Sequence, residues 1–213
     1  VYAFAGTPDG DLAMPPAYQV ASPFGADIGG VSPAISAVVA EAEFDSWLTV
    51  GETDGSAPDA ISASPGLGLD AWTATAGFNT NNGAIFWMNP ASGPSGSDIA
   101  MAQLTVPSAS AGSASGVVQG RPTEGTDDWQ SVVTWSWTGD GGGGSGGDFT
   151  GCEGCGIDTM SGSVDGYQTV RLTYTLSGTQ TNVYVLAGTP SGTALSVPPA
   201  YQVAAPFGAD IGG

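Results

Sequence analysis

The side chains in this chain that could carry chemistry are two cysteines, twenty carboxylates and two arginines, since lysine and histidine are absent. The cysteines form the sequence CEGC, at Cys152 and Cys155. Because tetrahedral zinc needs two further Cys or His ligands, a zinc site is excluded. A thioredoxin-like site would need a βαβ context, which the sequence does not predict. We therefore expect a disulfide within this glycine-rich loop, with bridges between subunits as the alternative.

The carboxylates suggest calcium, a hard cation that binds about six to eight oxygen atoms. The acidic loops lack EF-hand spacing, and carboxylates that are simply solvated are the alternative reading. A structural Ca²⁺ is the only cofactor that the sequence suggests. The candidate ligands are Asp54, Asp59, Asp127 and Asp128, with Asp9 and Asp11 as a further pair.

The charge balance excludes several classes of function. Without Lys and His there is no Ser-His-Asp site, no Schiff-base lysine and no P-loop lysine. A formal charge of −18 with two arginines argues against a nucleic-acid partner, because phosphates need a cationic surface. Glu41 and Glu43 would share a face in a strand and could form a glycosidase pair, but no accompanying signature supports it. We expect a protein that is not an enzyme.

The two ends of the chain repeat each other. Residues 1–8 match residues 183–190 at six of eight positions, and residues 15–30 match residues 198–213 at fifteen of sixteen. Such a period predicts a tandem array, in which the duplication is either only gene history or a connector between units. As a connector, it could lend a strand to a neighbour. The side chains expected to contact that neighbour are Tyr18, Val20, Phe24, Ile28 and their equivalents Tyr201, Val203, Phe207 and Ile211.

Alternating apolar and polar residues predict strands along most of the chain. Glycine and proline total 50 residues, a density of helix breakers that also argues for an all-β fold. Only residues 34–48 offer a helical alternative. No apolar run is long enough for a membrane span. The expected strands are residues 44–50, 84–88, 99–106, 115–119, 129–137, 167–176 and 183–186.

These elements predict a β-sandwich or jelly-roll repeat unit with a glycine-rich loop and a smaller C-terminal hairpin region. The expected divisions are a connector at 1–30, the main β-sandwich at 31–139, the loop with CxxC at 140–156, and the hairpin region at 157–213, whose residues 183–213 are the second connector copy.

Six tryptophans could serve either as core or as stacking platforms for sugars. In residues 129–137, Trp129, Val133, Trp135 and Trp137 share one side of the expected strand. We expect this side to face the core, because tryptophan is highly buried on average, and a sugar-binding platform is the alternative. We also expect each arginine to have an acidic partner: Arg121, for example, lies close in sequence to three carboxylates.

The strings FDSWLTVG, AIFWMNPASGPSG, AQLTVP and QGRPTEGTDDWQ resemble a repeated module in long, Gly- and Ala-rich surface proteins of single-celled marine algae. The resemblance covers roughly residues 1–138 and carries no catalytic residue to transfer. It implies a secreted, tandemly repeated part of a coat, a flagellar hair or another extracellular filament. The expected function is therefore a structural subunit that binds other copies of itself at the cell surface. The alternative is a tandem adhesive or carbohydrate-binding module, with calcium dependence.

Overall fold

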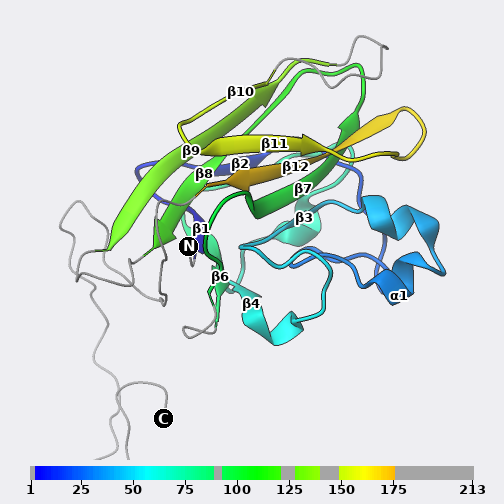
Figure 1. Ribbon diagram of the computed structural model, residues 1–213, viewed down its shortest axis with the longest axis horizontal. Coiled ribbons are helices and arrows are strands. Elements are labelled where there is room, and N and C mark those ends of the chain that lie inside the picture. The colour runs from blue at the N-terminus through cyan, green and yellow to red at the C-terminus, as the bar shows by residue number, and fades with distance from the viewer. Residues whose placement is uncertain (1–2, 89–92, 121–127, 140–148, 176–213) are drawn as a thin grey trace, which may run out of the picture.

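The strand-rich sequence folds into two antiparallel sheets, which the computed structural model describes for residues 3–88, 93–120, 128–139 and 149–175 (Figure 1). The predicted all-β, sandwich-like class is confirmed. The division of the chain into a connector, a sandwich and a hairpin region stays a prediction. No helix within the described residues is long and apolar enough to cross a membrane.

The larger sheet, sheet A, has the strand order β10-β9-β8-β1-β6-β4, and β2 joins it by pairing with β5 and β8. All these pairs are antiparallel. Its strands are β1 (Ala3–Gly6), β2 (Leu12–Met14), β4 (Ile61–Ala63), β5 (Phe78–Thr80), β6 (Gly83–Trp87), β8 (Gly112–Gly120), β9 (Trp129–Trp137) and β10 (Phe149–Gly151).

The smaller sheet, sheet B, has the order β11-β12-β7-β3 and is also antiparallel. Its long strands agree with the predicted runs at 99–106 and 167–176, whereas the run at 183–186 lies outside the described residues. The strands of sheet B are β3 (Trp47–Leu48), β7 (Ile99–Pro107), β11 (Cys155–Thr159) and β12 (Tyr167–Tyr174).

Helices occupy only short connections: α1 (Pro33–Ser36), η1 (Ala40–Phe44), η2 (Pro58–Ala60) and η3 (Leu69–Ala71), of which the η elements are 3₁₀ turns. The Ser32 hydroxyl caps α1, and proline follows at its first position. The segment at 34–48 therefore contains α1, η1 and the short strand β3 instead of one helix or one strand. Glu41 and Glu43 lie exposed in η1, where alternate residues do not share a face, so the strand-based pairing of these carboxylates was wrong.

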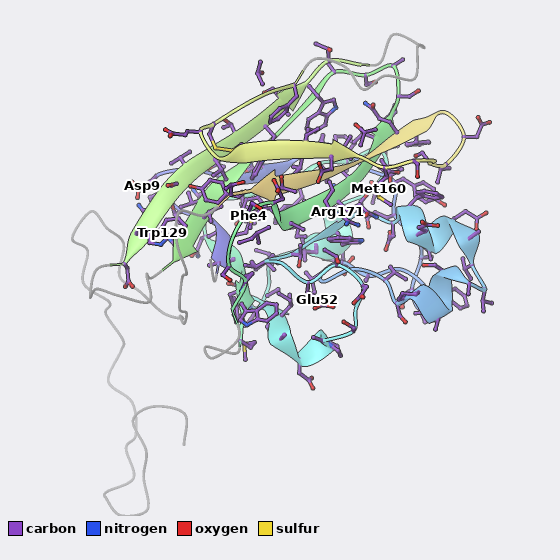
Figure 2. The ribbon with its side chains drawn as sticks, in the orientation of Figure 1. Phe4, Asp9, Glu52, Trp129, Met160 and Arg171 are labelled. Carbon is purple, nitrogen blue, oxygen red and sulfur yellow. A yellow bond between two sulfur atoms is a disulfide. The ribbon has the colours of Figure 1, made fainter. Side chains whose placement is uncertain are left out.

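The core lies between the two sheets. Phe4, labelled in Figure 2, and Trp135 are fully buried there. Their rings meet edge to face, with centroids 5.8 Å apart. Val133 and Trp137 are buried beside them, while Val132 on the other side of β9 is 52% exposed. The expectation that this side of β9 faces the core is therefore confirmed.

The outer face of sheet B is covered as well. Thr105 and Thr169 are buried there, and their hydroxyls lie 2.7 Å apart. The segment that includes η1 covers them: the Thr105 hydroxyl donates to the Phe44 carbonyl, at 2.6 Å. The period-two pattern of β12 thus predicted the strand correctly, but it did not reveal that both faces are buried, because threonine can hydrogen-bond inside a protein.

Candidate functional site

The described part of the first copy of the duplicated segment, residues 3–30, is built into the domain. Its strand β1 lies at the centre of sheet A, between β6 and β8. Phe4 faces the core, and Ala3 and Ala5 on the opposite face are only 4% and 3% exposed, so both faces of this strand are covered. Gly6 ends β1 at a close approach, where any Cβ atom would collide with the Thr80 carbonyl oxygen. The first copy therefore forms part of the folded core of the domain.

After β1, a tight turn closes between Thr7 and Gly10 through two backbone hydrogen bonds of 2.8 and 3.0 Å. Strand β2 then pairs with β5 along its whole length and with β8 at one position. Leu12 and Met14 of β2 are buried in the core. The Trp72 indole donates to the Pro15 carbonyl at 2.8 Å, which fixes the exit from β2.

The next stretch of the segment runs along sheet B. The Ala17 amide donates to the Thr73 carbonyl, and the Tyr18 amide donates to the Thr105 carbonyl, at 3.0 and 2.8 Å. The Tyr18 ring packs against Tyr167 with centroids 5.7 Å apart. Main-chain bonds of this kind bind a segment largely without regard to its side chains.

One carboxylate holds the following loop. Asp45 is fully buried, and its two oxygens accept hydrogen bonds from the Val20 and Ala26 amides, each at 2.7 Å. At Gly25 the chain passes so close to Asp45 and to the Val20 carbonyl that no Cβ atom fits. Asp45 therefore ties together two points of the segment that are six residues apart.

Burial raises the pKa of Asp45 from its ordinary 3.8 to about 6. The amides of Val20, Ala26 and Ser46 oppose this rise by hydrogen-bonding the charged form, and the nearby Asp27 charge adds to it. Hydrogen bonds thus hold the carboxylate in place, although its removal from water disfavours its charged form.

The segment ends against β3. The Leu48 amide donates to the Asp27 carbonyl at 3.0 Å, and the Gly29 amide donates to the Leu48 carbonyl at 2.9 Å. Ile28 thereby forms a parallel bridge with Leu48. We call the whole site that receives residues 3–30 the segment groove; its walls are β5, β6, β8, Thr73, Thr105, Asp45 and Leu48.

A network of polar side chains holds the main chain of Asp45. The Gln103 side-chain amide donates to the Asp45 carbonyl at 2.8 Å, and Arg171 donates to the Gln103 oxygen at 3.0 Å. The Arg171 guanidinium also lies over the Trp47 ring, 5.6 Å from its centroid. Burial lowers the pKa of Arg171, an effect that the Asp158 carboxylate opposes.

The expected acidic partner of Arg171 is thus replaced by an amide and an aromatic ring, and within the described residues its guanidinium makes no ion pair. Asp158 faces Arg171 across the β11–β12 pair but attracts it only at longer range. Arg121 lies outside the described residues.

The residues expected to contact a neighbouring unit have distinct positions in the first copy. Tyr18, Val20 and Ile28 are half-buried within their own domain, and Phe24 is 46% exposed. Phe24 and Ile28 also line a cavity of about 290 Å³ beside Glu52. Their contact with a neighbour stays a prediction. The equivalents in the second copy, Tyr201, Val203, Phe207 and Ile211, lie outside the described residues.

The candidate calcium ligands are dispersed. The side-chain and backbone groups of Ser56 hydrogen-bond Asp54 and lower the pKa of that carboxyl. Asp59 is exposed in η2, and Asp127 lies outside the described residues. Asp128 immediately precedes β9, and Asp9 and Asp11 accept hydrogen bonds from Gln130 and Asn79. In the described part of the chain, no three acidic or cysteine side chains come together as a metal site, so calcium stays a prediction.

The two cysteines form the predicted disulfide. Cys152 and Cys155 are joined with a Cα–Cα distance of 5.1 Å, in the turn where the chain passes from β10 of sheet A to β11 of sheet B. The Cys152 amide also donates to the Thr134 carbonyl of β9 at 3.2 Å. The bond thus closes a crossing between the sheets, which is a structural position.

Comparison with protein-family models, with curated proteins and with solved structures gives no match. The segment groove is therefore interpreted from its own chemistry. Sequence reasoning singled out the duplicated segment but missed Asp45, its main anchor. The one available signal was an aspartate two residues before the apolar pair of β3.

Proposed function

We propose that this protein is a structural repeat unit of a secreted tandem-repeat polymer, an extracellular filament or surface layer, whose units are joined through the duplicated segment. The observation that carries the proposal is that residues 3–30 form an integral part of the described domain, while residues 183–213 closely repeat the sequence of residues 1–30. A segment with this sequence has what it needs to complete a unit of the same fold.

The second copy keeps the residues that the groove demands. Gly188 and Gly208 stand where Gly6 and Gly25 make their close approaches. The glycines equivalent to Gly29 and Gly30, which have φ values of +75° and +86°, are also retained. Chance drift in a sequence without structural demands would not preserve these positions together.

Composition and charge support the rest of the proposal. The disulfide suits an oxidising, extracellular environment. The charge of −18 keeps repeated units solvated and attracts cations to the polymer surface. The resemblance to algal surface proteins points to the same location.

Negative-stain electron microscopy of the native material tests this proposal. We expect filaments or a regular layer, and a matched preparation of the chain without residues 183–213 should stay monomeric. Dispersed single particles in the native sample, under physiological salt, would contradict the structural role.

A tandem carbohydrate-binding module is the second candidate. Its support is a half-buried aromatic pair, Trp129 and Tyr174, which stack with centroids 6.3 Å apart. Against it, Trp47, Trp72, Trp135 and Trp137 are each no more than 5% exposed. Titration with soluble glycans decides between the two: quenching of tryptophan fluorescence that a Trp129→Ala variant loses would favour binding.

A further inference from the structure

We propose that residues 183–213 are a second occupant of the segment groove in their own chain, so that either copy of the duplicated segment can complete the domain. The inference concerns the same segment as the proposed joint, but it applies to a single chain and needs no polymer. The domain has one segment groove, and the sequence contains two segments that match it. Only one of these segments can fill the groove at a time.

Either copy of the segment could make the backbone hydrogen bonds that the groove offers. Its walls bind the backbone at Ala17, Tyr18, Val20 and Ala26, and these contacts do not depend on side-chain identity. The equivalent backbone positions in the second copy carry the same residue types: Ala200, Tyr201, Val203 and Ala209.

Three buried side chains of the first copy are replaced in the second: Ala3, Phe4 and Met14 correspond to Val185, Leu186 and Val197. Leu12 has the equivalent Leu195 after a one-residue insertion, so this core position stays apolar. Phe4 has the smaller equivalent Leu186. The Phe4 ring fills the space above Gly116, where a Cβ atom would collide with it. Leu186 would leave part of this space empty, so the first copy is the better occupant and the second is the minor one.

The first strand of the domain, β1, and the C-terminal end of its last described strand, β12, lie close together. Gln119 pairs with Ala3 on one side and with Gln130 on the other. The next residue of β9, Trp129, stacks on Tyr174 near the end of β12. In Figure 1 the N-terminal end lies below the tip of β12. Two strand spacings, one residue step, the ring stack and the two side chains that reach it bring these ends to within roughly 25–30 Å of each other.

The chain between the domain and the second copy is long enough for this distance. Ten residue steps separate Thr175 from Val185, the equivalent of Ala3, and they span up to about 33 Å when extended. The second copy can therefore enter the groove of its own domain in the orientation that the first copy has. In an array, each copy could then complete the unit before it or the unit after it.

A Gly25→Val substitution in the full chain tests this exchange. Valine at this position collides with the Val20 carbonyl inside the segment and with Asp45 in the groove wall, so the first copy can no longer take its bound conformation and we expect it to leave the groove. We expect the variant to keep cooperative unfolding, because the second copy takes over. The double variant Gly25→Val/Gly208→Val should lose it. Ala204→Val, whose equivalent Ala21 is exposed, adds bulk to the second copy without blocking it and is the matched control.

A cysteine pair reports directly on the occupant. Ala5 lies opposite Ala84 in the β1–β6 pair, and Ala187 is the equivalent of Ala5. Ala84→Cys/Ala187→Cys should cross-link within one chain only when the second copy fills the groove, with about a tenfold rise when Gly25→Val is added. Ala5→Cys/Ala84→Cys, which should cross-link without that substitution, is the positive control.

Three results would overturn the inference: Gly25→Val unfolds as fully as the double variant, it folds without the 84–187 cross-link, or the cross-link forms only between chains. Each result is read in dilute solution on monomers. Electron microscopy of the native material remains an independent test, so the polymer proposal can stand or fall separately.

Discussion

Asp45 is the residue on which the segment groove depends most. Its carboxylate accepts amides from Val20 and Ala26, which lie 25 and 19 residues away in the sequence. Few side chains could replace it, because both acceptors must be oxygen and the site is fully buried. The order of residues 20–26 therefore rests on one charged group.

We expect an Asp45→Asn substitution to lower the free energy of unfolding by about 2 to 4 kcal/mol, since the amide NH₂ would face a backbone N–H and leave a buried donor unpaired. Urea denaturation measures the change. Asp59→Asn, at an exposed position, should alter stability by less than about 0.5 kcal/mol. Equal effects of the two substitutions would show that Asp45 is no anchor.

The raised pKa of Asp45 also predicts a pH dependence of stability. The folded chain binds this proton with a pKa of about 6 and the unfolded chain with 3.8. Acidification from pH 7 to 4.5 therefore stabilises the fold through this group, by about 2 kcal/mol. Since Asp45→Asn cannot titrate, the difference in unfolding free energy between wild type and variant should widen by that amount. A difference that stays constant between these pH values would contradict the prediction.

At the level of elements, the fit of β1 against β8 decides which copy the groove prefers. A Gly116→Ala substitution should cost about 1 to 3 kcal/mol, because the added methyl collides with the Phe4 ring. In a Phe4→Leu background the cost should fall to less than half, since the smaller side chain can move aside. A double-mutant cycle of chemical unfolding measures this coupling. Additive costs would mean that Phe4 and Gly116 do not limit each other.

The elements also show how far the sequence alone could lead. Long runs of strand-forming residues predicted β7, β9 and β12: apolar and polar residues alternate in β9 and β12, whereas β7 is mostly apolar and buried on both faces. Short strands such as β4 and β10 were missed, since partners distant in sequence define them. Residues 1–30 were singled out as a repeat, but their position within sheet A depends on pairings with β6 and β8 that no local pattern contains.

The candidate site was less predictable than the fold. The duplicated segment was found from its repeat, and the disulfide followed from the CEGC sequence. The Asp45 anchor and the Arg171–Gln103 contact could not be derived from periodicity, because hydrogen-bond partners 19 to 68 residues apart leave no periodic signal. Buried polar networks are a property of the tertiary structure.

For the molecule as a whole, the charge of −18 should govern assembly. Raising NaCl from about 10 to 150 mM shortens the Debye length from about 30 to 8 Å, so we expect light scattering of assembled material to increase. CaCl₂ at equal ionic strength separates screening from specific binding. A larger effect of calcium, reversed by a chelator, would support a structural Ca²⁺, and an equal effect would remove it. Assembly that is insensitive to salt would contradict the electrostatic argument.

The central place of β1 has a consequence for biosynthesis. Within a unit, residues 3–6 are synthesised before their partners, which are residues 83–86 and 117–119. Sheet A therefore cannot close until about two thirds of a unit has been synthesised, and strand β1 stays unpaired throughout that time. Such late closure is typical of slow-folding β proteins and exposes strands that aggregate. In an array of the proposed kind, each such strand would stay free to pair with the wrong unit until its own unit has been synthesised.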